Sequence, residues 1–305
     1  MRLVLTFLSA LVLAWPSAAA EKAPFRVEIK QITHGPMTHF FGYIGHVQNI
    51  PWNQSGRYIV ALQTDFHDRM PGPDDPTNVV LIDTKNDYRV KVIEQSRGWN
   101  PQQGTMFYWN PAKPETQFFF NDRDRKTGKV FCVLYDIEQA RRIHEYRFND
   151  TPIGNGGVAQ NGGWFLGLNY ARMARLRPVT GYKGAWDWTK GIAHPKDDGL
   201  FKVDIGSGEK TLLVSFHRMA RELEALGRDM KTSHLFINHS LSNREGDRIF
   251  FFARAGWSGQ KGKRINHPFV TDLDGKSLRS NSIHIGGHPE WAYGHRMIGR
   301  LKERQ

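Results

Sequence analysis

Two short β patterns alternate along this 305-residue chain, and their fixed order constrains the fold more than any other feature of the sequence. The first is a polar turn followed by a burst of apolar residues, and the second is an apolar strand that ends in aspartate. The first pattern occurs at residues 52–60, 109–120, 160–166, 242–251 and 290–298. The second follows each of the first four copies, at residues 79–84, 133–136, 200–204 and 268–272. Both patterns are typical of short strands separated by turns, so they predict an all-β fold.

The order of the two patterns also predicts how the strands are grouped. The first pattern predicts a hairpin with a tight turn, and the second predicts a third strand whose aspartate opens a turn into a fourth. Four antiparallel strands repeated at a spacing of roughly 45 to 60 residues are typical of β-propeller blades. We therefore expect a β-propeller with four-stranded antiparallel blades, four complete and a fifth begun, in a ring that is incomplete in this chain. A β-sandwich of unrelated strands is the alternative, and the regular alternation favours the propeller.

The interval between the third and fourth copies of the pattern is longer than the others. It holds a segment rich in Gly and Trp near residues 179–198, and a segment at 216–230 that has apolar residues at helical spacing. Met219, Leu223 and Leu226 follow steps of three and four residues in this second segment. Both segments are expected to be insertions into the propeller, and the second is expected to be a helix.

The first twenty residues have the layout of a secretory signal. Arg2 supplies a positive charge, residues 3–15 are largely apolar, and small residues precede Glu21. We expect residues 1–20 to be a signal peptide, which leaves 21–305 as a single propeller domain in the periplasm or secreted from the cell. A buried N-terminal helix is the alternative. No later stretch is long and apolar enough to predict a membrane span.

The chain is basic, with 42 Lys and Arg against 30 Asp and Glu and a formal net charge of +12. A basic surface favours anionic partners such as nucleic acid, anionic lipid or acidic glycan, although the charge could serve solubility alone. Export and the scattered positions of the basic residues argue against nucleic acid. The single cysteine, Cys132, excludes an intrachain disulfide and lies in an apolar run, which predicts a buried structural thiol.

A series of short motifs points to a family. The motifs lie at residues 39–43, 51–53, 56–58, 81–83, 96–100, 102–104, 119–122, 236–239 and 287–291. With them the chain resembles the propeller-fold polysaccharide lyases of the oligogalacturonate lyase and ulvan lyase groups over most of residues 39–298. The resemblance implies β-elimination of uronate-containing oligosaccharides, with an acidic oligo- or polysaccharide as the partner. Relatives in these groups continue beyond the equivalent of Gln305, where oligogalacturonate lyases supply histidines to a metal site. The resemblance therefore implies that this chain lacks the final blade or two.

A polysaccharide lyase removes the proton beside a uronate carboxylate and expels the 4-linked sugar. The reaction needs a cationic partner for the carboxylate, a base and an acid. Arginine suits the first role, and Arg172, Arg175 and Arg177 lie close together in one segment between expected strands. Arg172 or Arg177 is expected to bind a substrate carboxylate, and a solvated basic loop is the alternative. Tyr182 is a nearby candidate for catalysis, and the family motif makes Gln103 a candidate for substrate binding.

Three histidines are candidates for proton transfer or metal binding. His39, His239 and His288 each lie at or just before the first strand of an expected blade, and such strands line the central channel of a propeller. His239 is the expected base, and His39 is expected to assist in binding or as the acid. His288 resembles a metal-binding histidine, which predicts a divalent cation such as manganese or calcium. For each histidine alone, a hydrogen-bonded structural role is the alternative, and no metal motif of known spacing is present.

Two classes of function follow. The first is an enzyme, a lyase acting on uronate-containing oligosaccharides outside the cytoplasm. The second is a non-catalytic propeller binding module of the cell envelope, because propellers carry many unrelated functions. A third possibility, the propeller part of a peptidase, lacks an attached catalytic domain in this sequence. The clustered arginines and the histidines favour the enzyme, and the incomplete ring favours the binding module.

Overall fold

The computed structural model describes residues 26–42, 49–257, 263–280 and 284–302. The chain divides into two units, Met1–Ile32 and Thr33–Gln305. Of the first unit only residues 26–32 are described, and these residues form no regular secondary structure. The expected signal peptide at residues 1–20 lies outside the described residues.

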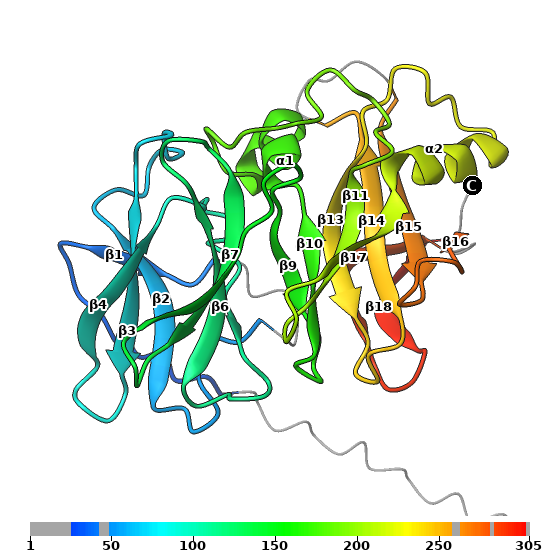
Figure 1. Cartoon of the computed structure of the whole chain (residues 1–305). Coiled ribbons are helices and arrows are strands. Elements are labelled where there is room, and N and C mark those ends of the chain that lie inside the picture. Colours follow the sequence, from blue (N-terminus) through cyan, green and yellow to red (C-terminus); the bar gives the residue numbers. More distant parts are fainter. Residues whose placement is uncertain (1–25, 43–48, 258–262, 281–283, 303–305) are drawn as a thin grey trace, which may run out of the picture. The chain divides into compact units, whose positions relative to one another are not determined.

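The second unit consists of antiparallel sheets whose strands are neighbours in the same order as in the chain (Figure 1). Blade 1 contains β1 (Thr38–Phe40), β2 (Tyr58–Thr64), β3 (Thr77–Asp83) and β4 (Arg89–Ser96). Blade 2 contains β5 (Tyr108–Trp109), β6 (Gln117–Arg123), β7 (Val130–Asp136) and β8 (Arg141–Tyr146). Blade 3 contains β9 (Gly154–Val158), β10 (Trp164–Leu168), β11 (Gly199–Asp204) and β12 (Lys210–Ser215). Blade 4 contains β13 (Phe236–Ser242), β14 (Ile249–Ala255), β15 (Ile265–Thr271) and β16 (Arg279–Ser280).

A fifth sheet follows these four blades. It pairs β17 (His284–Trp291) with β18 (Met297–Lys302), and it has two strands in the part of the chain that the structure describes. Successive four-stranded antiparallel sheets, each built from consecutive strands, are the architecture of a β-propeller. The predicted fold class is therefore confirmed, with four complete blades and a fifth sheet begun.

The turns that the sequence patterns predicted are held by the side chains that defined those patterns. In the first turn of blades 1 to 4 an asparagine side chain accepts a hydrogen bond from a backbone N–H a few residues later; these asparagines are Asn53, Asn110, Asn161 and Asn243. After the third strand an aspartate carboxylate accepts from backbone N–H groups in the same way; these aspartates are Asp83, Asp136, Asp204 and Asp272. Asn and Asp favour turns because their side chains can replace a backbone acceptor in this way.

The core lies between neighbouring blades, because the middle strands are buried on both faces. In β6, Phe118 and Phe120 pack with side chains of blade 1, whereas Phe119 packs with side chains of blade 3. Successive residues of a strand point to opposite faces, so one apolar run serves two interfaces. Cys132 lies on the second of these interfaces and is fully buried, as predicted, and burial raises the pKa of its thiol well above the ordinary value.

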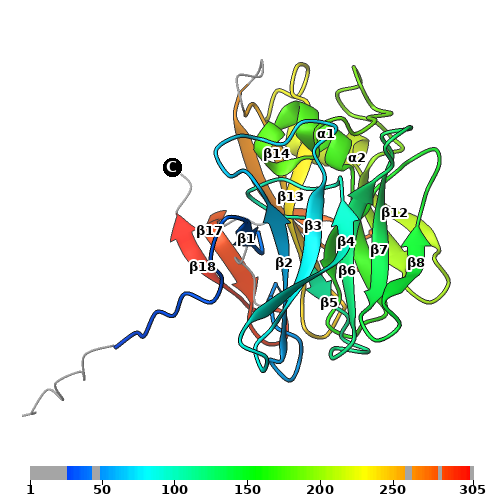
Figure 2. The same ribbon diagram turned by 90° about the vertical axis from the view of Figure 1, so that its left-hand side faces the viewer.

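Two helices lie at the same end of the sheets in both ribbon views (Figures 1 and 2). Helix α1 (Tyr170–Leu176) and the 3-10 turn η1 (Pro178–Thr180) lie between β10 and β11. Helix α2 (Phe216–Ala225) follows β12 and begins at Ser215, whose hydroxyl accepts a hydrogen bond from the N–H of Arg218 at 3.1 Å. The predicted helix at 216–230 is thus present but ends at Ala225, just before Gly227 adopts a positive φ of 76°. None of the described helices is long and apolar enough to cross a membrane.

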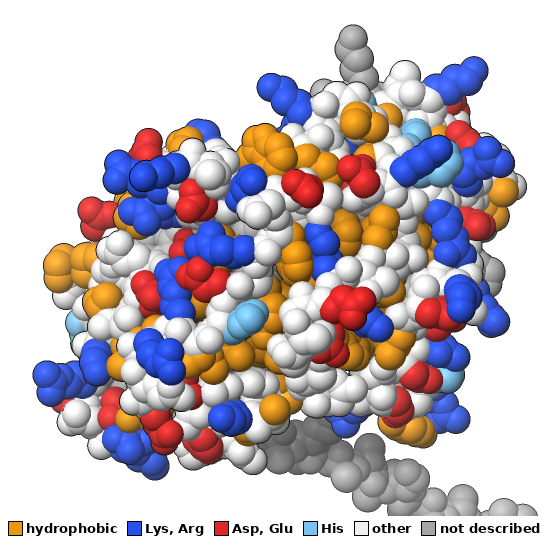
Figure 3. Space-filling model, viewed as in Figure 1, with side chains coloured by type: hydrophobic (Ala, Val, Ile, Leu, Met, Phe, Trp, Pro, Cys, Tyr) orange, Lys and Arg blue, Asp and Glu red, His pale blue; other side chains and the backbone are white. Residues whose placement is uncertain are grey.

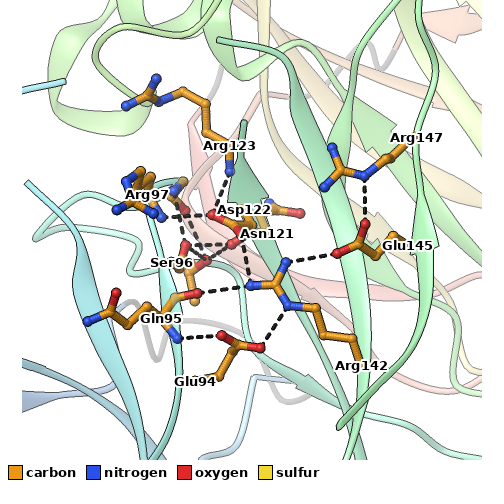
Figure 4. A network of polar contacts seen from close by, with 12 residues as sticks. Glu94, Gln95, Ser96, Arg97, Asn121, Asp122, Arg123, Arg142, Glu145 and Arg147 are labelled. Carbon is orange, nitrogen blue, oxygen red and sulfur yellow. Dashed lines mark hydrogen bonds and ion pairs between the residues drawn. The ribbon is translucent and has the colours of Figure 1, made fainter. Parts of the chain in front are cut away.

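A network of charged side chains joins blades 1 and 2 (Figure 4). Arg142 on β8 donates to Glu94 on β4 at 2.8 Å, to Asp122 on β6 at 2.9 Å and to Glu145 at 2.9 Å. Burial opposes the charged form of Arg142, but these carboxylates raise the pKa of its guanidinium above the ordinary value. Three carboxylates from three strands therefore depend on one guanidinium.

Replacement of Arg142 by alanine is expected to lower the free energy of unfolding by about 3 kcal/mol, because three half-buried carboxylates would lose their common partner. Urea denaturation of the purified variant measures this loss. The matched control is Arg141→Ala on the same strand, whose exposed side chain should contribute within about 0.5 kcal/mol. Equal stabilities of the two variants would contradict a structural role for the network.

Candidate functional site

The three candidate histidines lie on the first strands of their sheets, as the sequence predicts. His39 is on β1, His239 on β13 and His288 on β17. First strands of neighbouring sheets touch, β9 with β13 and β13 with β17. The rings of His239 and His288 consequently meet, with centroids 5.3 Å apart and planes inclined at 60°. Two of the three histidines are thus brought together, and we call them the histidine pair.

The backbone of β13 is irregular at His239. Its φ is 55°, a left-handed conformation that few non-glycine residues adopt. The pairing of β13 with β14 also shifts register between Asn238 and Leu241. Bulges of this kind re-aim a side chain, and here the imidazole of His239 also meets the edge of Phe252, with centroids 6.1 Å apart. The bulge and the left-handed backbone at residue 239 therefore determine the direction in which the His239 side chain points.

A small cavity beside His239 brings a second predicted residue into the site. Its volume is about 20 Å³. It is lined by Asn49, Gln103, Met106, Tyr108, Gly156, Leu168, Tyr170, Met173, Asn238, His239 and Ser240. Gln103 Oε1 and Asn238 Oδ1 are buried there without a hydrogen-bond partner. A cavity of this volume has room for about one water molecule, which would satisfy these two acceptors. Gln103 and His239, both predicted from the sequence, therefore share one cavity.

His39 belongs to a different arrangement. Its Nε2 lies 2.9 Å from Gln63 Nε2, Asn78 donates to Gln63 Oε1 at 3.0 Å, and Gln95 donates to Asn78 Oδ1 at 3.1 Å. These four side chains form a ladder across all four strands of blade 1. Because the amide of Gln63 donates to it, Nε2 of His39 acts as an acceptor, and burial lowers the pKa of this imidazole. His39 does not line the cavity beside His239.

Arg172 is an interior residue rather than a surface cation. It is 1% exposed, and its guanidinium donates to the carbonyls of Leu235, Ile192 and Ala193 and to the hydroxyl of Thr189. Burial lowers the pKa of Arg172 to about 10. Four of its five N–H donors serve the fold and the side chain is buried, so this position does not support the predicted contact with a substrate carboxylate.

Arg175 and Tyr182 also serve the interior around α1. Arg175 Nε donates to Asp187 Oδ2 at 2.8 Å, which occupies it with an internal ion pair. Tyr182 is fully buried, its ring stacks on Tyr170 with centroids 4.4 Å apart, and its hydroxyl accepts from Asn121 at 3.0 Å. Burial raises the pKa of the Tyr182 phenol well above its ordinary value. These positions support neither the predicted substrate binding by Arg175 nor catalysis by Tyr182.

Arg177 differs from its two neighbours, because its guanidinium lies 4.4 Å from the ring centroid of Trp257. Two further arginines approach the same indole, Arg254 at 5.2 Å and Arg264 at 3.8 Å. We call Arg177, Arg254, Trp257 and Arg264 the arginine–tryptophan cluster. It is a local concentration of three cations. Over the face drawn in Figure 3, Lys and Arg side chains are scattered among Asp and Glu.

The cluster and the histidine pair are linked through blade 4. Arg254 lies 4.8 Å from the centroid of Phe252, which is the same ring that His239 meets. Arg254 and Phe252 are two residues apart on β14 and so point to the same face of the strand. A row of contacts thus runs from His288 through His239, Phe252 and Arg254 to Trp257.

The histidine pair alone does not make a metal site. Divalent cations such as manganese or calcium need further ligands, whether imidazole or oxygen. The residues that the structure describes contain no group of three or more His, Cys, Asp or Glu that could hold an ion. The described residues therefore do not fit the predicted divalent metal.

Comparisons with known proteins agree with this architecture at low similarity. No protein-family model matches the chain, and no curated protein matches it. Among solved structures it is similar to an oligogalacturonate lyase in complex with manganese, with 12% identity and a TM-score of 0.40 over 88% of this chain and 73% of that one. It is also similar to the β-propeller domain of the Trilobed protease from Pyrococcus furiosus, with 12% identity and a TM-score of 0.39 over 75% of this chain and 56% of that one.

A third similar structure is the tricorn protease, with 11% identity and a TM-score of 0.36 over 76% of this chain. The chain spans 25% of the tricorn protease chain, and so only a minor part of that protein. Similarity at these identities does not identify an activity, because the similar structures include both a lyase and proteases. The assignment as a propeller rests on the blades themselves.

Sequence reasoning missed Trp257, Arg264, Arg254 and Asn238. One signal was present: Arg254 continues the apolar run of β14 and is 6% exposed, and a cation within a buried strand commonly has a functional or structural partner. Trp257 and Arg264 lie in an irregular connection between strands, where periodicity carries no information.

Proposed function

We propose that this chain is an exported, polysaccharide lyase-like protein that acts on uronate-containing oligosaccharides at the histidine pair. One observation carries the proposal: two imidazoles from neighbouring first strands meet beside a cavity that Gln103 lines. Imidazole is the side chain best suited to proton transfer near neutral pH. The resemblance of the sequence to propeller-fold lyases supports the choice of reaction.

In the proposed reaction His239 removes the C5 proton of a uronate. The electron pair of that C–H bond forms the new double bond between C4 and C5, and the bond from C4 to the glycosidic oxygen breaks. His288, which is exposed beside His239, returns a proton to the leaving oxygen. Of the three arginines predicted from the sequence, Arg177 is the one whose guanidinium is not committed to the interior, so it is our candidate partner for a carboxylate elsewhere on the oligosaccharide.

A non-catalytic binding module is the second candidate. Two observations favour it: the cavity beside His239 has a volume of only about 20 Å³, and the described residues contain no group that could hold a metal. A sugar ring does not fit into such a cavity, so in this candidate function the glycan would bind outside it and remain intact.

A lyase assay separates the two candidates. The purified protein is incubated with oligogalacturonides and a panel of acidic polysaccharides, with and without added manganese or calcium, and the ultraviolet absorbance of the new double bond is followed. The lyase proposal predicts absorbance with at least one uronate-containing substrate. Folded protein that yields no absorbance with any substrate, with or without metal, would contradict the lyase and leave the binding module.

A further inference from the structure

Two arginines of the arginine–tryptophan cluster have no acidic partner among the described residues. Arg177 and Arg264 both lie against Trp257, yet among the described residues neither forms an ion pair. Arg264 is exposed, and Arg177 and Trp257 are half-buried, so a molecule from solution can reach all three. The fold thus holds two positive charges on one indole and leaves them without a carboxylate.

Three other arginines on aromatic rings in this protein are neutralised by a carboxylate. Arg57 over Tyr58 pairs with Asp83 at 3.3 Å. Arg69 over Phe66 pairs with Asp75, and Arg147 over Phe131 pairs with Glu145 at 2.6 Å. The arrangement at Trp257 differs from these three, because Arg177 and Arg264 approach one indole and form no ion pair within the described part of the chain.

This convergence has an electrostatic cost. Burial and the neighbouring charge of Arg264 both lower the pKa of Arg177. Like charges at close range repel each other, and the repulsion is relieved when an anion binds between or beside them. A guanidinium also presents a planar fork of donors that matches two oxygens of a carboxylate. The missing anion is therefore expected to come from a ligand.

We propose that Arg177, Trp257 and Arg264 form a subsite that binds a carboxylate-bearing sugar ring other than the one that reacts. The indole holds the two guanidinium groups through cation–π contacts, and the guanidinium groups bind the carboxylate of the sugar. Phe252 and Arg254 are buried between this subsite and His239, so the ring bound at the subsite does not touch the histidine pair. The inference rests on the proposed function only for the choice of a uronate as ligand.

The test uses the full chain and two matched probes. The first probe is trigalacturonate, and the second is the same trimer with its carboxylates converted to methyl esters. Calorimetric titration should show binding of the acid trimer and much weaker binding of the ester, and added NaCl should weaken the former because it screens the charges. Arg177→Gln and Arg264→Gln should each lower affinity for the acid trimer by about tenfold, as expected for loss of a charge-assisted hydrogen bond.

The matched control is Arg296→Gln, which removes one exposed arginine that lies 5.0 Å from the ring of Tyr293, away from the cluster. It should bind the acid trimer as the unchanged protein does. Unchanged affinity in the Arg177→Gln, Arg264→Gln double variant would overturn the subsite, as would equal binding of acid and ester or no binding of the acid trimer. Failure of the lyase proposal can be distinguished from failure of the subsite. A protein that binds the trimer in this way but does not cleave it would support the subsite and contradict the lyase reaction.

Discussion

His239→Asn is expected to lower the rate of β-elimination by about a hundredfold to ten-thousandfold, which is the usual contribution of a general base. Asparagine is chosen because it tolerates the left-handed conformation of residue 239, where φ is 55°. His239→Ala removes the same base but places alanine in that conformation at a cost of about 1 kcal/mol. A lower rate in that variant could therefore reflect either the lost base or the lower stability. The measurement is the initial rate of absorbance increase with the substrate identified in the lyase assay.

The control for this prediction is His217→Ala, which removes an exposed histidine from α2. It should leave both the rate and the stability unchanged. His239→Asn should also retain the circular dichroism spectrum and the affinity for trigalacturonate, because the arginine–tryptophan cluster is intact. Turnover at the unchanged rate would remove His239 from the mechanism.

Arg172→Ala is expected to have the largest effect on stability, a loss of about 3–5 kcal/mol in the free energy of unfolding. The substitution leaves three backbone carbonyls and the buried hydroxyl of Thr189 without this donor. Burial raises the pKa of the Asp198 carboxyl to about 7, and the positive charge of Arg172 lowers it. The substitution removes this charge and so favours the protonated carboxyl. Urea denaturation at neutral pH measures the loss.

Arg221→Ala on the exposed face of α2 is the reference for this experiment, and it should change stability by no more than about 0.5 kcal/mol. The result bears directly on the hypothesis drawn from the sequence, in which Arg172 binds a substrate carboxylate. A variant that unfolds at the same urea concentration as the unchanged protein, but no longer binds acidic oligosaccharide, would restore that hypothesis and contradict the interior role.

The fold could be predicted because its signals are local. A turn held by Asn53 or Asp136 involves residues a few positions apart, and the apolar alternation of β6 is visible within seven residues. These signals recur in each blade, so repetition compensates for the weakness of any one copy. Even the helix after β12 was visible from the spacing of Met219 and Leu223, although its end was not.

The site was only partly predictable, because its residues meet through tertiary packing. The sequence indicated that His239 and His288 begin neighbouring sheets, but the contact between their rings depends on how those sheets pack. Arg172 and Arg177 look alike in the sequence, since both are cations in one short segment. The structure places the first among buried carbonyls and the second on an indole.

The all-β class, the division into blades and the residues that make the turns follow from the amino-acid sequence, because each depends on the conformational preferences of neighbouring residues. Which polar side chains serve the interior, and which can meet a ligand, depends on tertiary packing. Burial, partner choice and electrostatic repulsion depend on side chains from distant strands, as in the approach of Arg177 and Arg264 to Trp257. No pattern in the amino-acid sequence indicates that these side chains come into contact.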